Sequence, residues 1–394
     1  MNVLYVCADR GIPVLGSKGA SVHVRSLVAA MQRLGHKVTL AARSWEEGNP
    51  SPRVHRCERL AKDRGEAAEQ LEQMIRAERP DVVIERYSLE SDAARLATRR
   101  LGIQLTLEVN APLVAEATRY RSLDDPMAEQ REHDTFRTAD RIHVVSTALL
   151  RYVRSVAPDV PASWIPNGAD VSLLRAAVPC ELPSMDGRIV VGFIGSMKPW
   201  HGVDQLLEAF ARIHPHNPQT ALMLVGAGPK EAEVIERAGR ADMSGHALCT
   251  GHVPHAEVPA LLSRFDIAVA PYLPVEDFYF HPLKIVEYLA AGKPVVYSDQ
   301  GDLRALVGRG GLGYRPGSAP HLADRLGQLL ADGDQRSELA RSAAARGAQL
   351  DWSVIAERVL DFATGAADAC LGDPLAAVPA PPRIDEPDLA GRAP

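Results

Sequence analysis

Short apolar runs alternate with longer amphipathic stretches along most of the chain, and this alternation constrains the fold more than any other feature. Short apolar runs are typical of buried strands, and apolar residues spaced three and four apart are typical of helices. Their alternation predicts parallel sheets covered by helices. Strands are expected over 2–8, 37–42, 81–85, 103–109 and 141–145, and then over 188–195, 220–226, 266–270 and 294–298. The predicted fold class is therefore α/β, with two doubly wound parallel sheets.

A stretch with two prolines and a glycine, 178–187, separates the two halves and is typical of a linker. We therefore expect an N-terminal domain over 1–180 and a C-terminal domain over 181–350. Residues 351–364 have a helical pattern. Residues 365–394 are rich in Ala, Pro, Gly and Asp and lack an apolar pattern, so they are expected to form a disordered tail.

Composition excludes several classes of protein. The net charge of −6 and the pI of about 6.1 give no basic footprint for nucleic acid. We find neither a basic amphipathic helix nor a long apolar run, and we expect no stable membrane insertion. The five cysteines are scattered and the chain opens on a strand, so we expect reduced thiols and a cytoplasmic protein.

The segment 278–296 carries the most informative chemistry. A loop leads into a short apolar helix, which Gly292 ends, and a buried strand follows. The N-terminus of a helix has unpaired N–H groups and a partial positive charge, and Lys284 adds a full charge beside it. Glu287 lies one turn further, where a carboxylate can accept two vicinal hydroxyls of a ribose. The segment therefore predicts a binding site for a nucleoside diphosphate.

A second phosphate site is expected in the turn 196–202, which connects a buried strand to the helix that begins at Val203. Such turns at the carboxyl ends of parallel strands often bind anions. Lys198 is the firm cation in this turn, and we assign it to a phosphate; the alternative is a solvated surface lysine. His201 either assists Lys198 or is only a polar residue of the turn.

Two further regions place polar residues near strand ends. A glycine-rich turn precedes the first helix, where Gly19 allows close approach of a ligand and His23 either binds it or faces solvent. Glu108 and Asn110 end a buried strand and point to the same side of it, where they either meet a ligand or Asn110 only shapes the turn before Pro112. Arg86 follows another strand, and it either meets a ligand or pairs with Glu85 or another carboxylate.

These segments resemble the retaining nucleotide-sugar glycosyltransferases of GT-B fold in family 4, also called group 1. Their motif is E-x7-E, followed by an apolar helix and Gly-Lys-Pro-Val, and the second Glu matches Glu287. Tyr279 stands where the first Glu falls, so this chain departs from the pattern near the donor sugar. The turn at 165–170, Ile-Pro-Asn-Gly-Ala-Asp, is similar to the family's I-P-N-G-V-D.

The resemblance implies two Rossmann-like domains that face a cleft, with the acceptor on the N-terminal domain and the nucleotide sugar on the C-terminal domain. It implies that residues 351–364 form a helix that returns to the N-terminal domain. Beside Lys198, it assigns the donor nucleotide and diphosphate to Gly19, His201, Val253, Leu283, Lys284 and Glu287, and the acceptor to His23 and Arg86. The family's basic pair in the turn 196–202 would fall on Ser196 and His201, so the chain departs from the pattern there and Lys198 is assigned by its charge. It assigns Glu108 and Asn110 to the catalytic strand end.

The expected activity is transfer of a sugar from a nucleotide-diphosphate sugar to a soluble acceptor, with retention of configuration. We expect no cofactor and no metal, because lysines and a helix N-terminus can neutralise the leaving diphosphate. A GT-B epimerase or hydrolase remains an alternative, and Tyr279 keeps open a non-catalytic nucleotide-sugar-binding protein. An NAD dehydrogenase is disfavoured, because the turn at 225–229 does not complete G-x-G-x-x-G.

Overall fold

The computed structural model describes residues 1–16, 18–45, 57–121, 125–240 and 243–366. The described chain divides into two compact units. Unit 1 comprises Met1–Asp170, Asp277–Leu283 and residues 350–366. Unit 2 comprises Val171–Glu276 and Lys284–Gln349. Residues 367–394 of the predicted tail lie outside the described residues.

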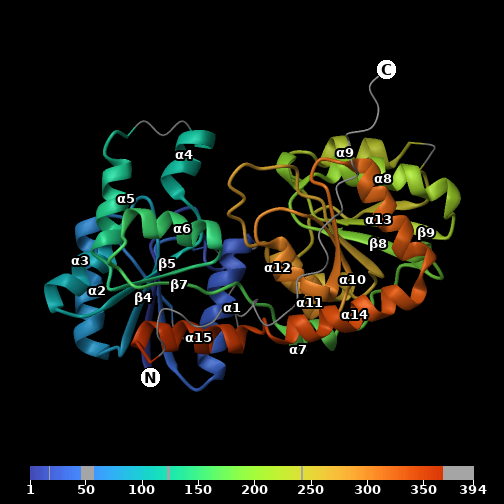
Figure 1. Ribbon diagram of the computed structural model, residues 1–394. Helices are drawn as coiled ribbons and strands as arrows, with labels where there is room; N and C mark the ends of the chain where they lie inside the picture. The colour runs from blue at the N-terminus through green and yellow to red at the C-terminus, as the bar shows by residue number, and fades with distance from the viewer. Residues whose placement is uncertain (17, 46–56, 122–124, 241–242, 367–394) are drawn as a thin grey trace. The chain divides into compact units, whose positions relative to one another are not determined.

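Unit 1 is built on a parallel sheet with the strand order β3-β2-β1-β4-β5-β6-β7 (Figure 1). Its strands are β1 (Asn2–Cys7), β2 (Lys37–Ala42), β3 (Cys57–Arg59), β4 (Val82–Arg86), β5 (Leu105–Val109), β6 (Arg141–Val144) and β7 (Ala162–Trp164). Its helices are α1 (Gly19–Arg33), α2 (Arg64–Glu78), α3 (Ala93–Leu101), α4 (Leu113–Arg121), α5 (Ala128–Arg137), α6 (Thr147–Val156) and α15 (Trp352–Thr364).

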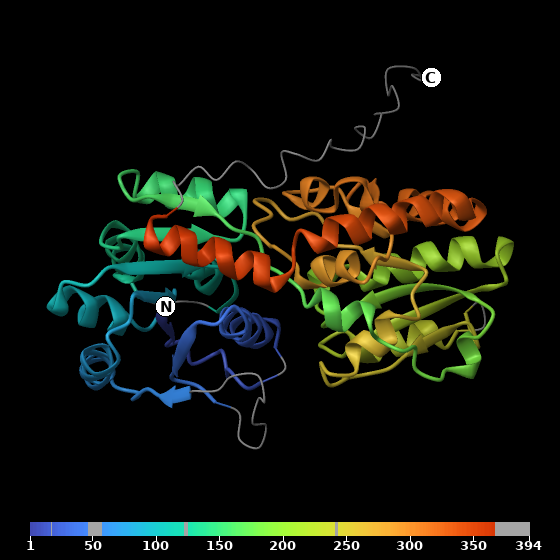
Figure 2. The same ribbon diagram turned by 90° about the horizontal axis from the view of Figure 1, so that it is seen from below.

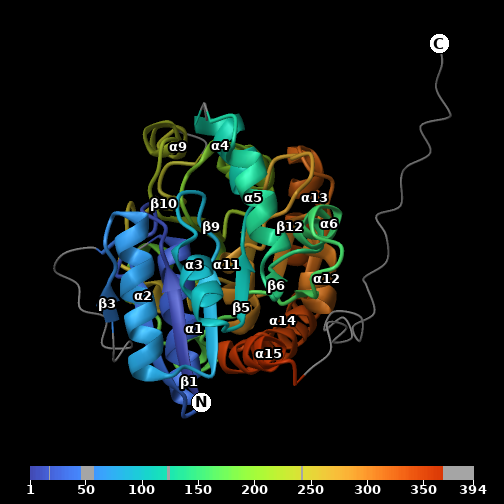
Figure 3. The ribbon, with the colours of Figure 1, turned by 90° about the vertical axis from the view of Figure 1, so that its left-hand side faces the viewer.

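Strand alternation divides the core of unit 1 between the two faces of this sheet. Leu4 and Val6 of β1 pack with α2, α3, α5 and α6, of which α2 and α3 lie side by side (Figure 3). Tyr5 and Cys7 of the same strand face the other way and pack with α1 and α15. Both faces are thus covered, as a parallel sheet requires.

Helix α15 belongs to unit 1, although it follows unit 2 in the sequence. It runs beside α1 (Figure 2), and its apolar face is buried against that helix and β1. Asp351 caps its N-terminus by accepting a hydrogen bond from the N–H of Ser353 at 2.8 Å. Ala169 exchanges backbone hydrogen bonds with Leu350 and Trp352 on either side of the cap. These contacts fix the point at which the chain returns to unit 1.

Two valines of α15 test this packing. Val359 is 1% exposed and Val354 is 36% exposed, so only the first loses buried contacts on truncation. We expect Val359→Ala to destabilise the protein by about 2 kcal/mol and Val354→Ala by less than about 0.5 kcal/mol. Urea denaturation of both variants measures the difference. Equal losses in the two variants would show that α15 does not pack as described.

Unit 2 contains a second parallel sheet with the order β10-β9-β8-β11-β12-β13. Its strands are β8 (Ile189–Ile194), β9 (Thr220–Val225), β10 (Ala247–Cys249), β11 (Ile267–Ala270), β12 (Val295–Ser298) and β13 (Gly311–Tyr314). Its helices are α7 (Val171–Arg175), α8 (Val203–Ile213), α9 (Glu231–Ala238), α10 (Val258–Leu262), most of α11 (Leu283–Ala290), α12 (Leu303–Val307), α13 (Ala319–Ala331) and α14 (Gly333–Ala348).

The two parallel sheets confirm the predicted fold class, and all nine predicted strands are present. The sequence prediction missed four strands, β3, β7, β10 and β13, and each lies at the edge of a sheet. These strands have only three or four residues and are partly exposed. They therefore lack the apolar run that marks a buried central strand.

Candidate functional site

The turn after β8 in unit 2 depends on two glycines. Gly195 has a φ of 143°, and a Cβ there would lie 2.7 Å from Nζ of Lys284. The turn continues as a 3-10 helix, Pro199–His201, and ends at Gly202, whose φ is 67°. A side chain at Gly202 would collide with the carbonyl oxygen of Pro271. The backbone therefore passes close to the Lys284 ammonium, which a bulkier residue would prevent.

Lys284 is a buried cation in the first turn of α11. Its Nζ lies 4.1 Å from the ring centroid of Phe193 and 5.2 Å from that of Tyr272. No carboxylate of the described residues forms an ion pair with it. Burial lowers the pKa of Lys284 to about 7, although the negative charge of Glu287 opposes this shift. The ammonium is therefore partly desolvated and can gain strongly from an anionic ligand.

Glu287 lies one helical turn after Lys284, so both side chains emerge from the same side of α11. The Oε1 atom of Glu287 lies 3.2 Å from Nε2 of His255, in the loop that follows Val253. Tyr288 fixes the helix, because its hydroxyl oxygen accepts a hydrogen bond from the N–H of Ile194 at 2.8 Å. The sequence prediction missed His255, which no motif marks.

Lys198 and His201 occupy the same turn but differ in character. Lys198 is exposed, with Nζ 5.0 Å from the ring centroid of Trp200. His201 donates a hydrogen bond from Nδ1 to the carbonyl oxygen of Ser196. Burial, together with the charge of Lys284, lowers the pKa of His201 to about 2. His201 is therefore a neutral hydrogen-bonding ring, and Lys198 supplies the charge of this turn.

The pKa of Lys284 predicts a pH dependence. A diphosphate binds the charged ammonium, and this charge is lost as the pH rises through about 7. We expect the affinity for a nucleoside diphosphate to fall by up to about tenfold per pH unit from pH 7 to 9, where the ligand is already fully ionised. Calorimetric titration over this range measures the slope. The slope should disappear in Lys284→Arg, whose charge persists; an unchanged slope would assign it to another group.

In unit 1, the predicted residues meet at a single buried carboxylate. Glu108 is 0% exposed. Its Oε1 atom lies 2.8 Å from Nη1 of Arg86, 2.8 Å from Nε2 of His23 and 2.5 Å from Nδ2 of Asn110. Its Oε2 atom accepts a hydrogen bond from the Tyr5 hydroxyl at 2.8 Å. The structure thus brings four of the predicted residues together and adds Tyr5.

The electrostatics of this cluster favour the ionised carboxylate. Burial raises the pKa of Glu108, but the charge and hydrogen bond of His23 and the charge of Arg86 outweigh it and hold this pKa well below its ordinary value. His143 lies 3.8 Å from the carboxylate, and burial lowers its pKa to about 4, so its ring is neutral. Glu108 itself has no exposed surface, and it can act on a ligand only through His23, Arg86 or Asn110.

His23 is held from both of its ring nitrogens. Nε2 contacts Glu108, and Nδ1 lies 2.8 Å from Oδ1 of Asn167. Asn167 donates a second hydrogen bond, at 2.9 Å, to the carbonyl oxygen of His281. The ring also meets the edge of Trp352, with centroids 5.2 Å apart. The turn at 165–170, which is similar to the family's I-P-N-G-V-D, therefore positions His23, a role that its sequence did not reveal.

The sequence left open which carboxylate Arg86 contacts. The structure pairs it with Glu108 and not with Glu85. Glu85 points to the opposite face of the sheet, as strand alternation requires. It is buried there, and burial together with the nearby charge of Asp92 raises its pKa to about 8. The register explains the pairing, because Arg86 lies directly opposite Glu108 on the neighbouring strand.

Two predicted residues near the helix starts lie together in unit 1. A Cβ on Gly19 would lie 3.7 Å from Cδ1 of Leu283, an ordinary contact, so sterics alone do not require glycine there.

Tyr279, at the position of the motif's first Glu, donates a hydrogen bond to the carboxylate of Glu116 in α4. The tyrosine therefore contacts a carboxylate from another element instead of supplying one.

Among the described residues, no helix is both long enough and apolar enough to cross a membrane. The same part of the chain contains no cluster of three or more His, Cys, Asp or Glu side chains arranged to bind a metal ion.

Family models match both units. Residues 18–168 match the glycosyl transferase 4-like domain, and residues 188–332 match glycosyl transferases group 1. The chain belongs to the group 1 glycosyl transferases. The match confirms the family that the motifs at 278–296 and 196–202 resemble.

Curated relatives of this glycosyl transferase are distant. An alpha-D-kanosaminyltransferase from Streptomyces kanamyceticus is 23% identical over 264 residues, which are 63% of this chain and 67% of the relative. A phosphatidyl-myo-inositol mannosyltransferase from Mycobacterium leprae is 30% identical over 199 residues, which are 50% of this chain and 51% of the relative. The chain thus spans about half to two thirds of the length of the curated relatives it matches.

Solved structures show that this glycosyl transferase has the GT-B fold. Anabaena HepE in complex with UDP-glucose matches with a TM-score of 0.71 at 18% identity, and the match covers 93% of this chain and 100% of that chain. Sucrose-phosphate synthase from Thermosynechococcus elongatus also matches with a TM-score of 0.71, at 20% identity, covering 92% and 98% of the two chains.

Proposed function

We propose that this group 1 glycosyl transferase moves a sugar from a nucleotide-diphosphate sugar to a hydroxyl of a soluble acceptor, with retention of anomeric configuration. The observation that carries the proposal is the Lys284 ammonium, which is buried beside the Gly195 turn without an acidic ion-pair partner among the described residues. A nucleoside diphosphate is the anion that suits it, because Glu287 follows one turn later and can accept ribose hydroxyls.

The donor side stabilises the leaving group. When the bond between sugar and phosphate breaks, negative charge grows on the departing diphosphate, and preorganised cations stabilise this charge most strongly where water is excluded. Lys284 is such a cation, and Lys198 adds a solvent-exposed charge in the neighbouring turn. His201 supplies a neutral hydrogen-bonding group, and backbone groups near Val253 and Leu283 contact the nucleotide. These charges serve in place of a metal ion in this proposal.

The acceptor side lies in unit 1. His23, Arg86 and Asn110 share the Glu108 carboxylate, which holds their side chains in fixed positions. We assign the acceptor to Arg86, which uses only Nη1 on Glu108, with the His23 ring fixed beside it by Glu108 and Asn167. We assign the developing charge at the sugar to Asn110. Glu108 acts as a positioning residue, because it is fully buried.

The relatives and the cysteines support this proposal. One relative is named as a GDP-mannose-dependent mannosyltransferase, and one structural neighbour was solved with UDP-glucose. The four cysteines of the described chain have free thiols, which is typical of a reducing compartment, and we place the enzyme in the cytoplasm. Because Tyr279 stands where the family's motif has its first Glu, one competing function remains, a nucleotide-sugar-binding protein without turnover.

Glu287→Ala tests the donor assignment. Loss of a hydrogen bond to a charged group is expected to weaken nucleoside-diphosphate binding by about tenfold or more. Titration calorimetry with UDP, GDP and ADP, using the nucleotide that binds best, measures the change. Glu338→Ala is the control, because Glu338 is exposed on α14 of the same unit. Unchanged affinity in Glu287→Ala would place the nucleotide elsewhere.

A further inference from the structure

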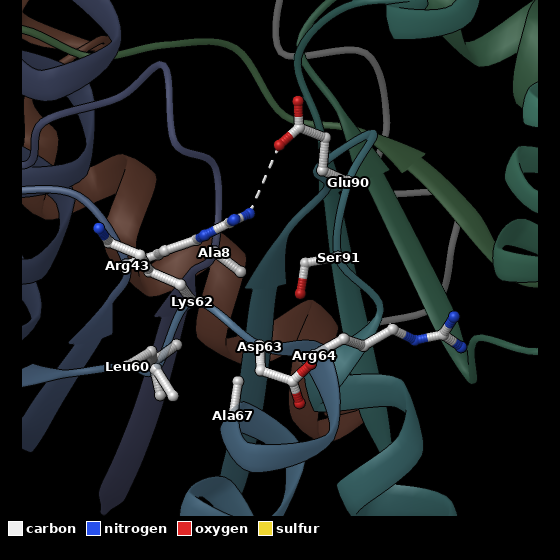
Figure 4. Close-up of a pocket in the computed structure, with 10 residues that line it drawn as sticks. Ala8, Arg43, Leu60, Lys62, Asp63, Arg64, Ala67, Glu90 and Ser91 are labelled. Atoms are coloured by element: carbon white, nitrogen blue, oxygen red, sulfur yellow. Dashed lines mark hydrogen bonds and ion pairs between the residues drawn. The ribbon is translucent and has the colours of Figure 1, made fainter. Parts of the chain in front are cut away.

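A pocket opens at the carboxyl edge of the unit 1 sheet, and none of the residues assigned above lines it (Figure 4). Ala8 follows β1, Arg43 follows β2, and Glu90 and Ser91 follow β4. The start of α2 closes the remaining side. In the sheet β3-β2-β1-β4-β5 the strand numbers fall up to β1 and rise from β4, while all strands stay parallel. The pocket therefore lies at a topological switch point. Doubly wound sheets bind ligands at this place.

The carboxylates of the pocket are already engaged by protein groups. Glu90 forms an ion pair with Arg10 at 2.7 Å and accepts a hydrogen bond from Arg43 at 3.4 Å, and Figure 4 shows the contact with Arg43. Asp63 caps α2, because its Oδ1 atom accepts hydrogen bonds from the N–H groups of Gly65 and Glu66. Neither carboxylate is therefore a ready acceptor for a hydroxyl or an amine of a ligand.

The groups of the pocket that remain available to a ligand are hydrogen-bond donors. The Lys62 ammonium has no hydrogen bond or ion pair with any described residue. Arg43 donates one long hydrogen bond, from Nη1 to Glu90, and its other guanidinium N–H groups remain available. The Ser91 oxygen accepts from the N–H of Ala93, which leaves its proton to donate. Two of these three groups are cations, and the N-terminus of α2 adds partial positive charge.

We propose that this pocket binds a negatively charged group, a phosphate or a carboxylate, of a small ligand, with Lys62 and Arg43 as its cationic contacts. A bidentate Arg beside a Lys is well suited to such an anion. That the ligand is the sugar acceptor rests on the proposed function. The pocket then selects acceptors that carry this anionic group over neutral sugars.

Titration calorimetry with glucose 6-phosphate and with glucose tests the proposal. The full chain is first saturated with its best-binding nucleoside diphosphate, so that the donor site is filled. If no nucleotide binds, the same titrations use the free protein. The sugar affinities can then still be compared, even though the proposed function has failed. The variants are Lys62→Gln, Lys62→Arg and Lys37→Gln, the last at the opposite end of β2.

Glucose 6-phosphate should bind the wild-type protein at least about tenfold more tightly than glucose. This affinity should fall about tenfold in Lys62→Gln and persist in Lys62→Arg and Lys37→Gln. Equal binding of the two sugars, unchanged affinity in Lys62→Gln, or no saturable binding up to about 10 mM would each overturn the proposal.

Discussion

Replacement of Glu108 by alanine is expected to destabilise unit 1 by about 3–5 kcal/mol, because removing one partner of a buried ion pair leaves the other charge uncompensated. Arg86 and His23 are 8% and 5% exposed and would both lose their carboxylate. Tyr5 and Asn110 would lose hydrogen bonds as well. Urea denaturation measures the loss.

Two comparisons make the Glu108 result specific. Glu69→Ala removes an exposed carboxylate from α2 and should change stability by less than about 0.5 kcal/mol. The folded pKa of Glu108 lies below its unfolded value, so its contribution is complete above about pH 4.3 and declines as the pH falls below it. The difference between Glu108→Ala and wild type should therefore narrow in acid. A loss no larger than that of Glu69→Ala would contradict the buried cluster.

Lys284→Ala is expected to lower kcat/KM by about 10²–10³. The ammonium is held against two aromatic rings, so its charge is preorganised where the leaving diphosphate forms. Because the negative charge is larger in the transition state than in the bound donor, most of the loss should appear in kcat. Steady-state kinetics at saturating donor separates the two parameters.

Lys37→Ala is the control for general charge effects, because Lys37 is exposed at the start of β2. The circular dichroism spectrum of Lys284→Ala should match that of wild type, which shows that the variant still folds. A loss confined to KM would mean that Lys284 only holds the donor. Activity equal to that of wild type would remove it from the reaction.

The central strands were predictable because a strand buried on both faces needs a continuous apolar run, as in Val190, Val191 and Phe193 of β8. The edge strands were not predicted, because a strand at the edge of a sheet needs no continuous apolar run. The grouping of Glu108 with Asn110 was also predictable, since strand alternation places residues two apart on one side, and their 2.5 Å contact confirms it.

Other parts of the site depend on contacts between distant residues. Tyr5 and Asn167 reach the cluster only through strand register and through the turn beside α15, which no local pattern encodes. The complete burial of Glu108 follows from packing of α1 and α15 on the same face. The pocket around Lys62 joins four separate segments, so its residues share no motif.

The most direct measurement incubates the purified protein with a panel of nucleotide sugars and follows release of the nucleoside diphosphate, with and without an acceptor extract. Transfer predicts release that depends on the acceptor, with the sugar on the product and the donor's anomeric configuration retained in its proton coupling constants. Equal release without acceptor would indicate hydrolysis, and binding without release under any condition would indicate a binding protein. Either outcome would contradict the proposed glycosyl transfer.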